Sequence, residues 1–330
     1  MSVLITGATG QVGNAIARRL AADGVHIRAL VHSRMRGTSN VLPEGVQTVF
    51  GDVTDAASLR GAFDGCDTVY HAAGIPEQWR RDPAEFTRVN AEGTRHVVEA
   101  ALASGVKRFV YTSTDDVLLA APGIPFDEPI VDRTPGRTPY QRSKREADRI
   151  VTAALDRGLP AVFLHPSGVY GPAPFLTRGL NDLLVGLALR KVPALLPGGM
   201  TLVYSEDVAD GHIRAASRAE VGARYILTES YQPLIDIARA VVRVASSARV
   251  PRIMPLALAN AIATIGEPVA RLTGRPPMIP RSLLQFLERD ARPTGTRARA
   301  ELEWRPIPFV TGVERSLAYF GQRGWTRSSS

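Results

Sequence analysis

The sequence lacks several features that define large protein classes. Its only cysteine is Cys66, which excludes an internal disulfide and disfavours a cysteine-based metal site. We therefore expect no metal and a reducing, cytoplasmic environment. Residues 3–5 are apolar and are preceded by no basic segment or cleavage site, so we expect the chain to begin as a strand and not as a signal peptide.

Long apolar runs and blocks of like charge are also missing. The longest apolar run, residues 253–265, is shorter than the roughly 20 residues that a membrane-spanning helix needs, so no stable membrane insertion is expected. We predict a buried helix there, with a membrane-touching helix as the alternative. Lys and Arg number 40 against 32 Asp and Glu, but the basic residues are scattered, which argues against a nucleic-acid partner.

The chain opens with a glycine-rich turn between an apolar strand and a helix. Residues 2–6 form the predicted strand, and Gly7, Gly10 and Gly13 follow it at once with the spacing G-x-x-G-x-x-G. Glycines allow a phosphate to approach the backbone closely, and the amides at the start of the helix stabilise its charge. This turn predicts a dinucleotide site, with a merely tight turn as the alternative.

The end of the next predicted strand, residues 25–31, bears on the choice of cofactor. An acidic residue there would bind the ribose 2′-hydroxyl of NAD, but none is present. Arg34 or Arg36 instead offers a cation for the 2′-phosphate of NADP. We therefore expect NADP to be preferred over NAD, with solvated loop arginines as the alternative.

Two further strand ends carry candidate cofactor contacts. Asp52 follows the third predicted strand and could accept a hydrogen bond from an adenine amine. Ala72, Ala73 and Gly74 follow the fourth, and their small side chains leave room for a cofactor against the backbone. His71 precedes them, and we interpret it as a structural histidine and not as a catalytic base.

A helix with a well-marked start carries the candidate catalytic pair. Thr138, Pro139 and Gln141 form a capping box with proline at the first helical position. Tyr140 and Lys144 are four residues apart, so their side chains share one helix face. A neighbouring cation lowers the pKa of a tyrosine from its usual value of about 10, as acid–base catalysis requires. The alternative is an ordinary surface pair.

Hydroxyl groups stand at the end of the fifth predicted strand, residues 107–112. Ser113 and Thr114 lie at its carboxyl end, where doubly wound folds bind their ligands, and either could bind a carbonyl oxygen. A turn-forming Ser-Thr pair is the alternative. A sixth predicted strand covers residues 161–165. Alternating strands and helices predict an α/β fold with a Rossmann-type, doubly wound parallel sheet.

Taken together, these motifs resemble the extended short-chain dehydrogenase/reductase superfamily, also called the NAD-dependent epimerase/dehydratase family. The resemblance covers residues 1 to about 175. Within it, the stretches around Ser113 and residues 297–306 resemble the branch of 3β-hydroxysteroid dehydrogenases and dihydroflavonol reductases. The motifs that carry the resemblance are Thr6-Gly7-Ala8-Thr9-Gly10-x-x-Gly13, Gly51-Asp52-Val53-x-Asp55, His71-Ala72-Ala73-Gly74, Tyr111-Thr112-Ser113-Thr114, Tyr140-x-x-x-Lys144 and Pro166-Ser167-Gly168-Val169-Tyr170-Gly171-Pro172.

The resemblance implies a role for each matching residue. Tyr140 would exchange a proton with the substrate oxygen while hydride moves to or from the nicotinamide, and Lys144 would hold the ribose and lower the pKa of Tyr140. Thr114, or Ser113, would bind the substrate oxygen. The implied cofactor contacts are Gly7, Thr9, Gly10, Gln11, Val12, Gly13, Arg34, Asp52, Val53, Ala72, Ala73, Gly74, Lys144, Pro166, Gly168 and Val169.

The second half of the chain is predicted to be a smaller, mostly helical substrate lobe. We place the cofactor domain at residues 1–172 and the lobe at residues 173–330, with one sheet strand returning near residues 224–227. The arginines that clasp the diphosphate of nucleotide sugars in this superfamily are replaced by Ala173-Pro174 and Thr201-Leu202-Val203. Leucines near the expected lid favour a hydrocarbon ligand, with core packing as the alternative; they are Leu183, Leu184, Leu187, Leu189, Leu195 and Leu196.

Three functions remain open from the sequence. The favoured one is an NAD(P)-dependent oxidoreductase that interconverts a secondary alcohol and a ketone on a steroid-like, flavonoid-like or β-hydroxy/β-keto acyl substrate. The first alternative is an epimerase or dehydratase that acts on a nucleotide sugar, and the second is a non-catalytic, cofactor-binding regulator. The expected partner is a small-molecule substrate, and a homodimer is compatible with the sequence.

Overall fold

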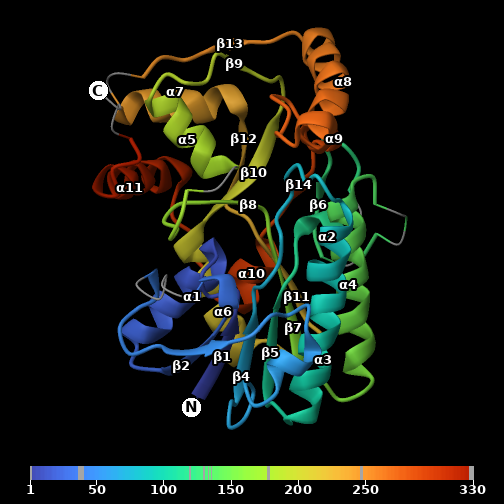
Figure 1. The fold of residues 1–330 in the computed structure, drawn as a ribbon. Coiled ribbons are helices and arrows are strands. Elements are labelled where there is room, and N and C mark those ends of the chain that lie inside the picture. Colours follow the sequence, from blue (N-terminus) through green and yellow to red (C-terminus); the bar gives the residue numbers. More distant parts are fainter. Residues whose placement is uncertain are drawn as a thin grey trace.

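The computed structural model describes residues 2–35, 41–118, 120–128, 131–132, 134, 136–176, 179–245 and 248–326. Its lower half in Figure 1 is built on a seven-stranded sheet whose neighbouring strands are all parallel. The strands in sheet order are β11 (Arg224–Leu227), β7 (Ala161–Pro166), β5 (Arg108–Thr112), β4 (Thr68–His71), β1 (Ser2–Thr6), β2 (His26–Val31) and β3 (Gln47–Phe50).

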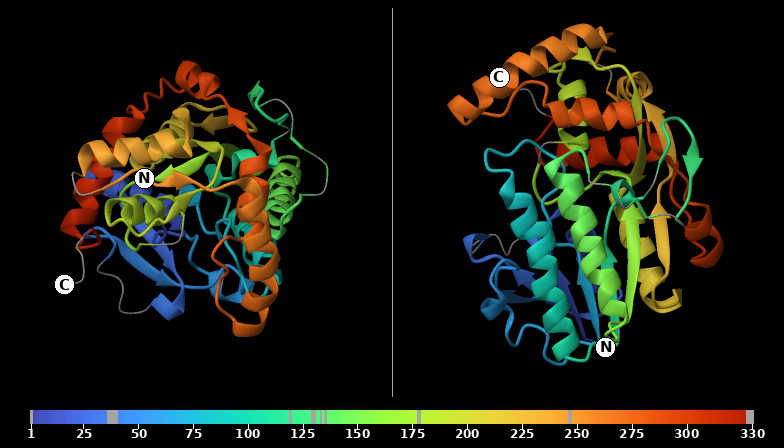
Figure 2. Two further views of the ribbon diagram at one scale, coloured as in Figure 1. Left: turned by 90° about the horizontal axis from the view of Figure 1, so that it is seen from above. Right: turned by 90° about the vertical axis from the view of Figure 1, so that its right-hand side faces the viewer.

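Helices cover both faces of this sheet because each strand buries both of its faces. In β1, Val3 and Ile5 pack beneath α1 (Gln11–Ala22) and α6 (Ser205–Arg218), whereas Leu4 points to the opposite core. That second core lies under α3 (Gly93–Ala103) and α4 (Pro139–Leu155), which run side by side in Figures 1 and 2. The predicted doubly wound sheet is confirmed, including the strand that returns at residues 224–227.

The helical segment between β4 and β5 is interrupted. A short α2 (Ala84–Phe86) continues into a π-helical turn, η4 (Thr87–Glu92), before α3 begins. Such a turn widens the helix by one residue per turn and re-aims the side chains within it. Sequence periodicity did not reveal the turn, because apolar residues still recur at helical spacing on both sides of it.

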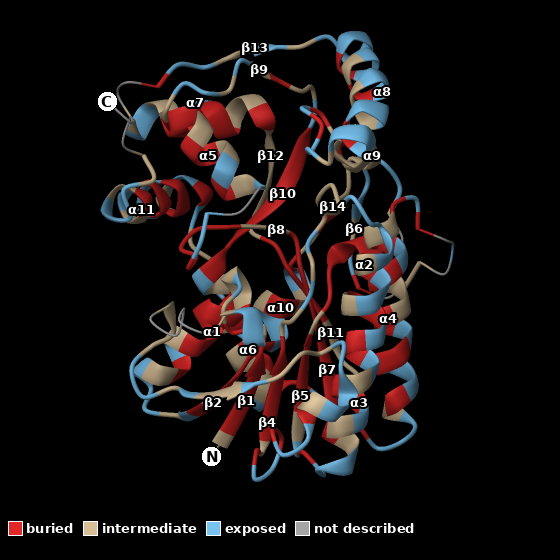
Figure 3. Ribbon diagram, viewed as in Figure 1, coloured by how far each residue is buried: buried red, intermediate tan, exposed pale blue. Residues whose placement is uncertain are grey.

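The second lobe combines a small sheet with helices. Strand β10 (Gly199–Tyr204) pairs in parallel with β8 (Gly168–Tyr170) and antiparallel with β12 (Ser230–Pro233). The core beside it, red in Figure 3, is formed with α5 (Leu180–Ala188), α7 (Leu234–Val244) and α11 (Phe309–Gln322). Leu184, Leu187 and Leu195 are buried in this core, and Leu183, Leu189 and Leu196 pack against it. These leucines therefore serve as core, and the expectation that they line a ligand pocket is not supported.

A pair of two-residue strands connects the two lobes, and helices lie at the outer edge of the second lobe. Two-residue strands β14 (Arg292–Pro293) and β6 (Pro125–Phe126) pair in parallel and tie the end of the chain to its first half. The outer edge carries α8 (Leu256–Thr273), α9 (Arg281–Arg289) and the pairing of β9 (Ala194–Leu195) with β13 (Arg252–Ile253). The boundary at residue 172 stays a prediction.

Helix α8 contradicts the expectation of a buried helix at residues 253–265. Ile265 is 70% exposed and Leu272 is 84% exposed, whereas mainly small side chains such as Ala259 and Ala263 face inward. Within the described part of the chain, no helix is both long and apolar enough to cross a membrane.

A glutamate occupies a backbone conformation that suits glycine. After α10 (Thr296–Glu301), Glu303 has a φ of +53°, in the left-handed region where a side chain is disfavoured. The neighbouring Trp304 is fully buried, and its indole Nε1 donates to the carbonyl of Asp207 at 2.8 Å, so the backbone is held in place. Glu303 also pairs with Arg218 at 2.6 Å, but this exposed ion pair contributes little.

We expect Glu303→Gly to raise the free energy of unfolding by up to about 1 kcal/mol, because glycine relieves the left-handed backbone. Urea unfolding at neutral pH measures the change. Glu303→Ala is the matched control, since it removes the same ion pair but keeps the unfavourable φ. A glycine variant no more stable than the alanine variant would contradict this account.

Candidate active site

The start of α4 has the geometry that its sequence predicts. The Thr138 side chain accepts from the backbone N–H of Gln141 at 3.1 Å, and the Gln141 side chain reaches back to the backbone at the cap. Pro139 occupies the first turn. This capping box fixes the helix start, so Tyr140 and Lys144 enter the site from the first two turns of a rigid helix.

Lys144 is buried at the carboxyl end of β5. Its ammonium Nζ donates to the backbone carbonyl of Thr112 at 2.9 Å and lies 3.5 Å from the hydroxyl of Tyr111. Burial lowers the pKa of Lys144 to about 8, and the negative charge of Asp148 partly opposes this shift. The lysine is therefore still mainly protonated at neutral pH and places a cation at the strand end.

Tyr140 lies beside Thr114 and packs its ring edge against Phe86, with the ring centroids 6.1 Å apart. The Thr114 side chain lies close enough to the Tyr140 hydroxyl to act against the rise in its pKa, and the Thr114 hydroxyl also accepts from the backbone N–H of Asp116 at 3.3 Å. The pKa of Tyr140 is raised above its ordinary value, first by burial and then by the negative charge of nearby carboxylates. The expectation that Lys144 lowers this pKa is therefore wrong for the protein alone, because burial and the carboxylates dominate.

The two hydroxyls at the end of β5 point to different surroundings. The Thr114 side chain faces Tyr140. The backbone carbonyl of Thr114 accepts a hydrogen bond from Nδ1 of His165 at 3.0 Å. Ser113 instead donates its hydroxyl to the carboxylate of Asp148 at 3.0 Å. Asp148 in turn receives both Nη groups of Arg224 at 2.8 and 2.9 Å. The structure therefore brings Thr114, and not Ser113, to Tyr140 and places Ser113 in a structural network.

The glycine turn is packed so tightly that side chains would not fit. Gly7 has a φ of +73°, and a Cβ added there would lie 2.6 Å from the backbone of Ala72. A Cβ at Gly13 would lie 2.3 Å from the carbonyl oxygen of Gly7. Gly10 caps α1 without a side chain, so the first amides of this helix, at Gln11 and Val12, have no side-chain acceptor at the cap. A backbone cradle at a helix N-terminus fits a pyrophosphate.

Other predicted cofactor contacts border this cradle. The Gln11 side chain donates to the carbonyl of Gly171 at 3.2 Å and so joins the cradle to the turn after β8. That strand holds Gly168 and Val169 and follows Pro166 at the end of β7. Thr9 in the turn is partly exposed. These residues lie at the junction of the two lobes, where a long cofactor would have to cross.

At the end of β2 the structure adds a residue that the sequence reasoning missed. The Nε2 of His32 lies 2.9 Å from the carboxylate of Asp52, which also accepts from the backbone N–H of Thr54 at 2.9 Å. Although burial acts to raise the pKa of Asp52, the hydrogen bonds from Thr54 and the charge of His32 outweigh it, and the pKa is lowered. Arg34 is exposed next to this pair, and Arg36 lies outside the described residues.

Small residues after β4 are held in position by Asn90. Its amide donates to the carbonyl of Ile75 at 3.0 Å and to the hydroxyl of Ser143 at 3.0 Å, and its oxygen accepts from the N–H of Ile75 at 2.7 Å. A Cβ at Gly74 would lie 3.1 Å from that oxygen. Asn90 lies in the π-helical turn, so this irregularity links the Gly74 segment to α4.

Ala72, Ala73, His71 and Val53, the other predicted positions at or after the ends of β3 and β4, are held by hydrogen bonds or by packing. The backbone N–H of Ala72 donates to the carbonyl of Thr6 at 3.2 Å, and that of Ala73 donates to the Thr6 hydroxyl at 3.3 Å. Burial lowers the pKa of His71 to about 3, so it stays neutral and structural. Val53 packs against Gly93 of α3, where a Cβ would lie 2.9 Å from its side chain.

Three acidic side chains surround Tyr140, and none was predicted. Glu77 accepts from the Thr138 hydroxyl at 2.7 Å, and burial raises its pKa to about 7. Burial and the charge of Asp116 also raise the pKa of Asp115 to about 7. With Asp116, these carboxyls contribute to the raised pKa of Tyr140. Because the pKa values of Glu77 and Asp115 are both about 7, the negative charge near Tyr140 grows as the pH rises through neutrality.

Arg289 of α9 bridges the two lobes at this acidic group. Its guanidinium pairs with the carboxylate of Asp116 and donates to the carbonyls of Asp115 and Leu118, each at 3.1 Å. The contact joins residues more than 170 positions apart, so no local pattern could have revealed it. It holds the loop that carries Thr114 against the second lobe.

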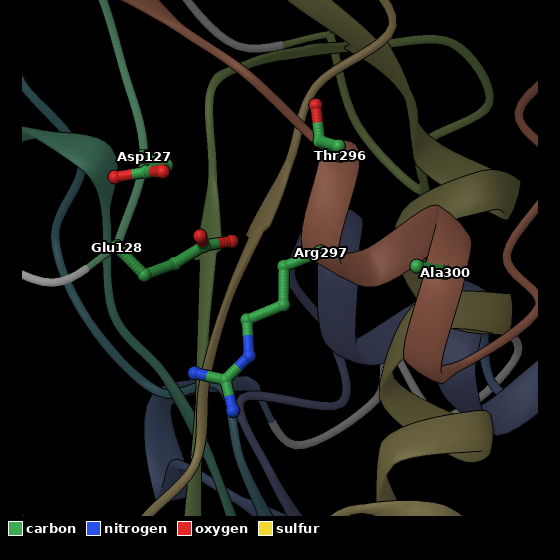
Figure 4. Close-up of a pocket in the computed structure, with 5 residues that line it drawn as sticks. All are labelled: Asp127, Glu128, Thr296, Arg297 and Ala300. Atoms are coloured by element: carbon green, nitrogen blue, oxygen red, sulfur yellow. The ribbon is translucent and has the colours of Figure 1, made fainter.

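Figure 4 shows a pocket elsewhere on the protein, lined by Asp127, Glu128, Thr296, Arg297 and Ala300. Two of its polar side chains are already engaged, because Glu128 accepts from the backbone N–H of Ile226 at 2.7 Å and Arg297 donates to Glu301 at 2.9 Å. It contains none of the predicted site residues. Among the described residues, no group of three or more His, Cys, Asp or Glu side chains is arranged to hold a metal.

Residues 3–227 match the family described as the NAD dependent epimerase/dehydratase family, and the chain belongs to this family. The predicted family resemblance is thereby confirmed, and the protein is an enzyme of the extended short-chain dehydrogenase/reductase type.

The chain is similar over much of its length to several reductases and dehydrogenases. Sterol demethylase protein B of Methylococcus capsulatus is 27% identical over 98% of this chain and 99% of its own. A putative dihydroflavonol 4-reductase of Synechocystis is 27% identical over 98% of this chain and 96% of its own length. Human 3 beta-hydroxysteroid dehydrogenase type 7 is 33% identical over 66% of this chain and 63% of its own length. The crystal structure of gox2253 is 30% identical and covers 99% of both chains with a TM-score of 0.86.

The raised pKa of Glu77 predicts a pH-dependent stability. The folded protein keeps a proton that the unfolded chain releases above its ordinary pKa of 4.5, so stability falls as the pH rises from about 4.5 to 7. We expect Glu77→Gln to remove up to about 3 kcal/mol of this fall, measured by urea unfolding between pH 5 and 8. The exposed Glu288→Gln is the control, and an unchanged pH profile in Glu77→Gln would contradict the assignment.

Proposed function

We propose that the protein is an NADP-linked reductase or dehydrogenase that interconverts a secondary alcohol and a ketone on a neutral, largely hydrophobic substrate. The observation that carries this proposal is the approach of Tyr140 to the Thr114 side chain at the carboxyl end of β5, where the buried ammonium of Lys144 donates to the carbonyl of Thr112. A proton donor, a second hydroxyl and a cation thus meet at one strand end, where parallel sheets bind their ligands.

The cofactor would lie across the carboxyl ends of the strands. Gly7, Gly10 and Gly13 form a cradle that fits a pyrophosphate, and Lys144 would contact the nicotinamide ribose. The exposed Arg34 next to His32 offers positive charge to a 2′-phosphate, which supports NADP. The nicotinamide supplies or accepts the hydride when it is bound.

In the direction of reduction, Tyr140 would donate its proton to the substrate oxygen as that oxygen gains negative charge. Its raised pKa keeps the phenol protonated at neutral pH, so a donor is available. Thr114 would donate a hydrogen bond to the same oxygen and hold it within reach of Tyr140.

Two features support a neutral substrate. Glu77, Asp115 and Asp116 surround Tyr140, so an anionic group next to the reacting carbon would meet negative charge. The positions where nucleotide-sugar enzymes carry clasp arginines hold Ala173-Pro174 and Thr201-Leu202-Val203. The names of the relatives, which refer to a sterol, a dihydroflavonol and a hydroxysteroid, agree with a hydrophobic alcohol or ketone.

A substrate panel tests the proposal directly. We expect neutral steroid and flavanone ketones to support oxidation of NADPH, and matched carboxylated ketones to have a kcat/KM lower by about tenfold or more, because the acidic side chains oppose a second anion. NADH should support a slower reaction. UDP-glucose and dTDP-glucose should neither react nor raise the melting temperature. Turnover of a nucleotide sugar, together with no turnover of any of the ketones, would favour an epimerase or dehydratase.

Tyr140→Phe should lower kcat by about 10²- to 10⁴-fold with little change in cofactor affinity, because only the proton donor is lost.

The two hydroxyls at the end of β5 provide a matched pair of variants. Thr114→Val should also lower kcat, and Thr114→Ser should restore most of it. Ser113→Ala should keep kcat, since its hydroxyl binds Asp148. Equal losses for Ser113→Ala and Thr114→Val would exclude the proposed roles.

A further inference from the structure

Helix α8 has two apolar faces, and only one of them is packed. The inner face carries Ala259 and Ala263, which form a small core with Ile279 and Leu284. The outer face carries four large apolar residues at positions 0, 7, 11 and 14 of a helical repeat, which places them along one side. They are Leu258, Ile265, Val269 and Leu272, with exposures of 51%, 70%, 52% and 84%. We call them the outer stripe.

Helix α8, which carries the outer stripe, lies at the outer edge of the second lobe and contacts α9 (Figure 1). Figure 3 shows most of the surface of α8 as exposed. Exposed apolar side chains also flank both ends of α8, with Ile253 at 52% before the helix and Met278 at 79% after it. A monomeric protein seldom leaves a row of apolar side chains this long in water unless it binds something.

The charge around the outer stripe identifies the kind of partner. Residues 248–281 contain five arginines and one acidic residue, Glu267, which gives a net charge of 5 − 1 = +4. Glu267 accepts from the backbone N–H of Arg281 at 3.2 Å, so it is directed toward the start of α9. Within the described part of the chain, none of these arginines forms an ion pair; they are Arg249, Arg252, Arg271, Arg275 and Arg281, all exposed.

A second copy of the chain fits this surface poorly. A twofold dimer would bring the same face of both copies together and would place arginines opposite arginines. An anionic lipid surface satisfies both properties at once, because the apolar side chains enter the boundary between headgroups and acyl chains while long arginines reach the phosphates.

We propose that α8 docks the protein on anionic phospholipid membranes by lying in the interface along its outer stripe. The inference rests on this surface alone and does not depend on which reaction the site performs. Docking would also bring the membrane close to α9, whose Arg289 holds the loop that carries Thr114.

Co-sedimentation of the full chain with vesicles tests the proposal. We expect binding to vesicles of phosphatidylcholine with phosphatidylglycerol, weaker binding to phosphatidylcholine alone, and loss of binding at high salt. The double variant Ile265→Asp/Leu272→Asp should lower the partition coefficient by about tenfold or more, because charged side chains replace the stripe. Arg252→Ala/Arg271→Ala should lower it by a similar factor, at about fivefold per arginine.

The matched control is Val221→Asp, which places a charge at another apolar side chain that is 56% exposed and lies outside the stripe. It should bind vesicles like the parent protein, and all variants should keep the parent melting temperature because the changed side chains are on the surface. Equal binding by the stripe variant and the control would overturn the proposal. So would a lack of vesicle binding by the parent together with a concentration-dependent dimer that the stripe variant abolishes.

Discussion

The buried ion pair between Asp148 and Arg224 holds the candidate site together. Asp148 lies on α4 and is 1% exposed, and Arg224 lies on β11 at the edge of the sheet. Asp148 also accepts from Ser113, and Arg224 contacts the ring of Phe163 at 4.1 Å and the Nε2 of His165 at 3.3 Å. Because a buried carboxylate needs such partners, the pair ties α4, the helix that carries Tyr140, to the edge strand of the sheet and to the end of β5.

The acidic side chains around Tyr140 give the site its electrostatic character. Burial alone would raise the pKa of a tyrosine, and the carboxyls of Glu77, Asp115 and Asp116 add to this. The guanidinium of Arg289 balances part of their charge and comes from the second lobe. The protonation of the candidate donor is therefore set by both lobes and not by the Tyr-Lys spacing on one helix.

Local features were predictable where neighbouring residues alone decide the conformation. The capping box at Thr138 and Gln141 and the glycine turn at Gly7 need contacts only among residues close in sequence or at adjacent strand ends. The alternation of strands and helices likewise indicated the parallel sheet. The π-helical turn at Asn90 was not predicted, because one extra residue in a helix leaves the apolar pattern almost unchanged.

By itself, the sequence determined the family, the doubly wound sheet, the tight glycine turn before α1 and the placement of Tyr140 and Lys144 on one helix, because these depend on short motifs and on periodicity. Only the tertiary structure gave Ser113 and Thr114 different surroundings, reversed the expected shift in the pKa of Tyr140 and turned the apolar face of α8 outward. The physical reason is that hydroxyl partners, burial and charge are set by residues far apart in the chain. The contact of Arg289 with Asp116 joins the two lobes in this way.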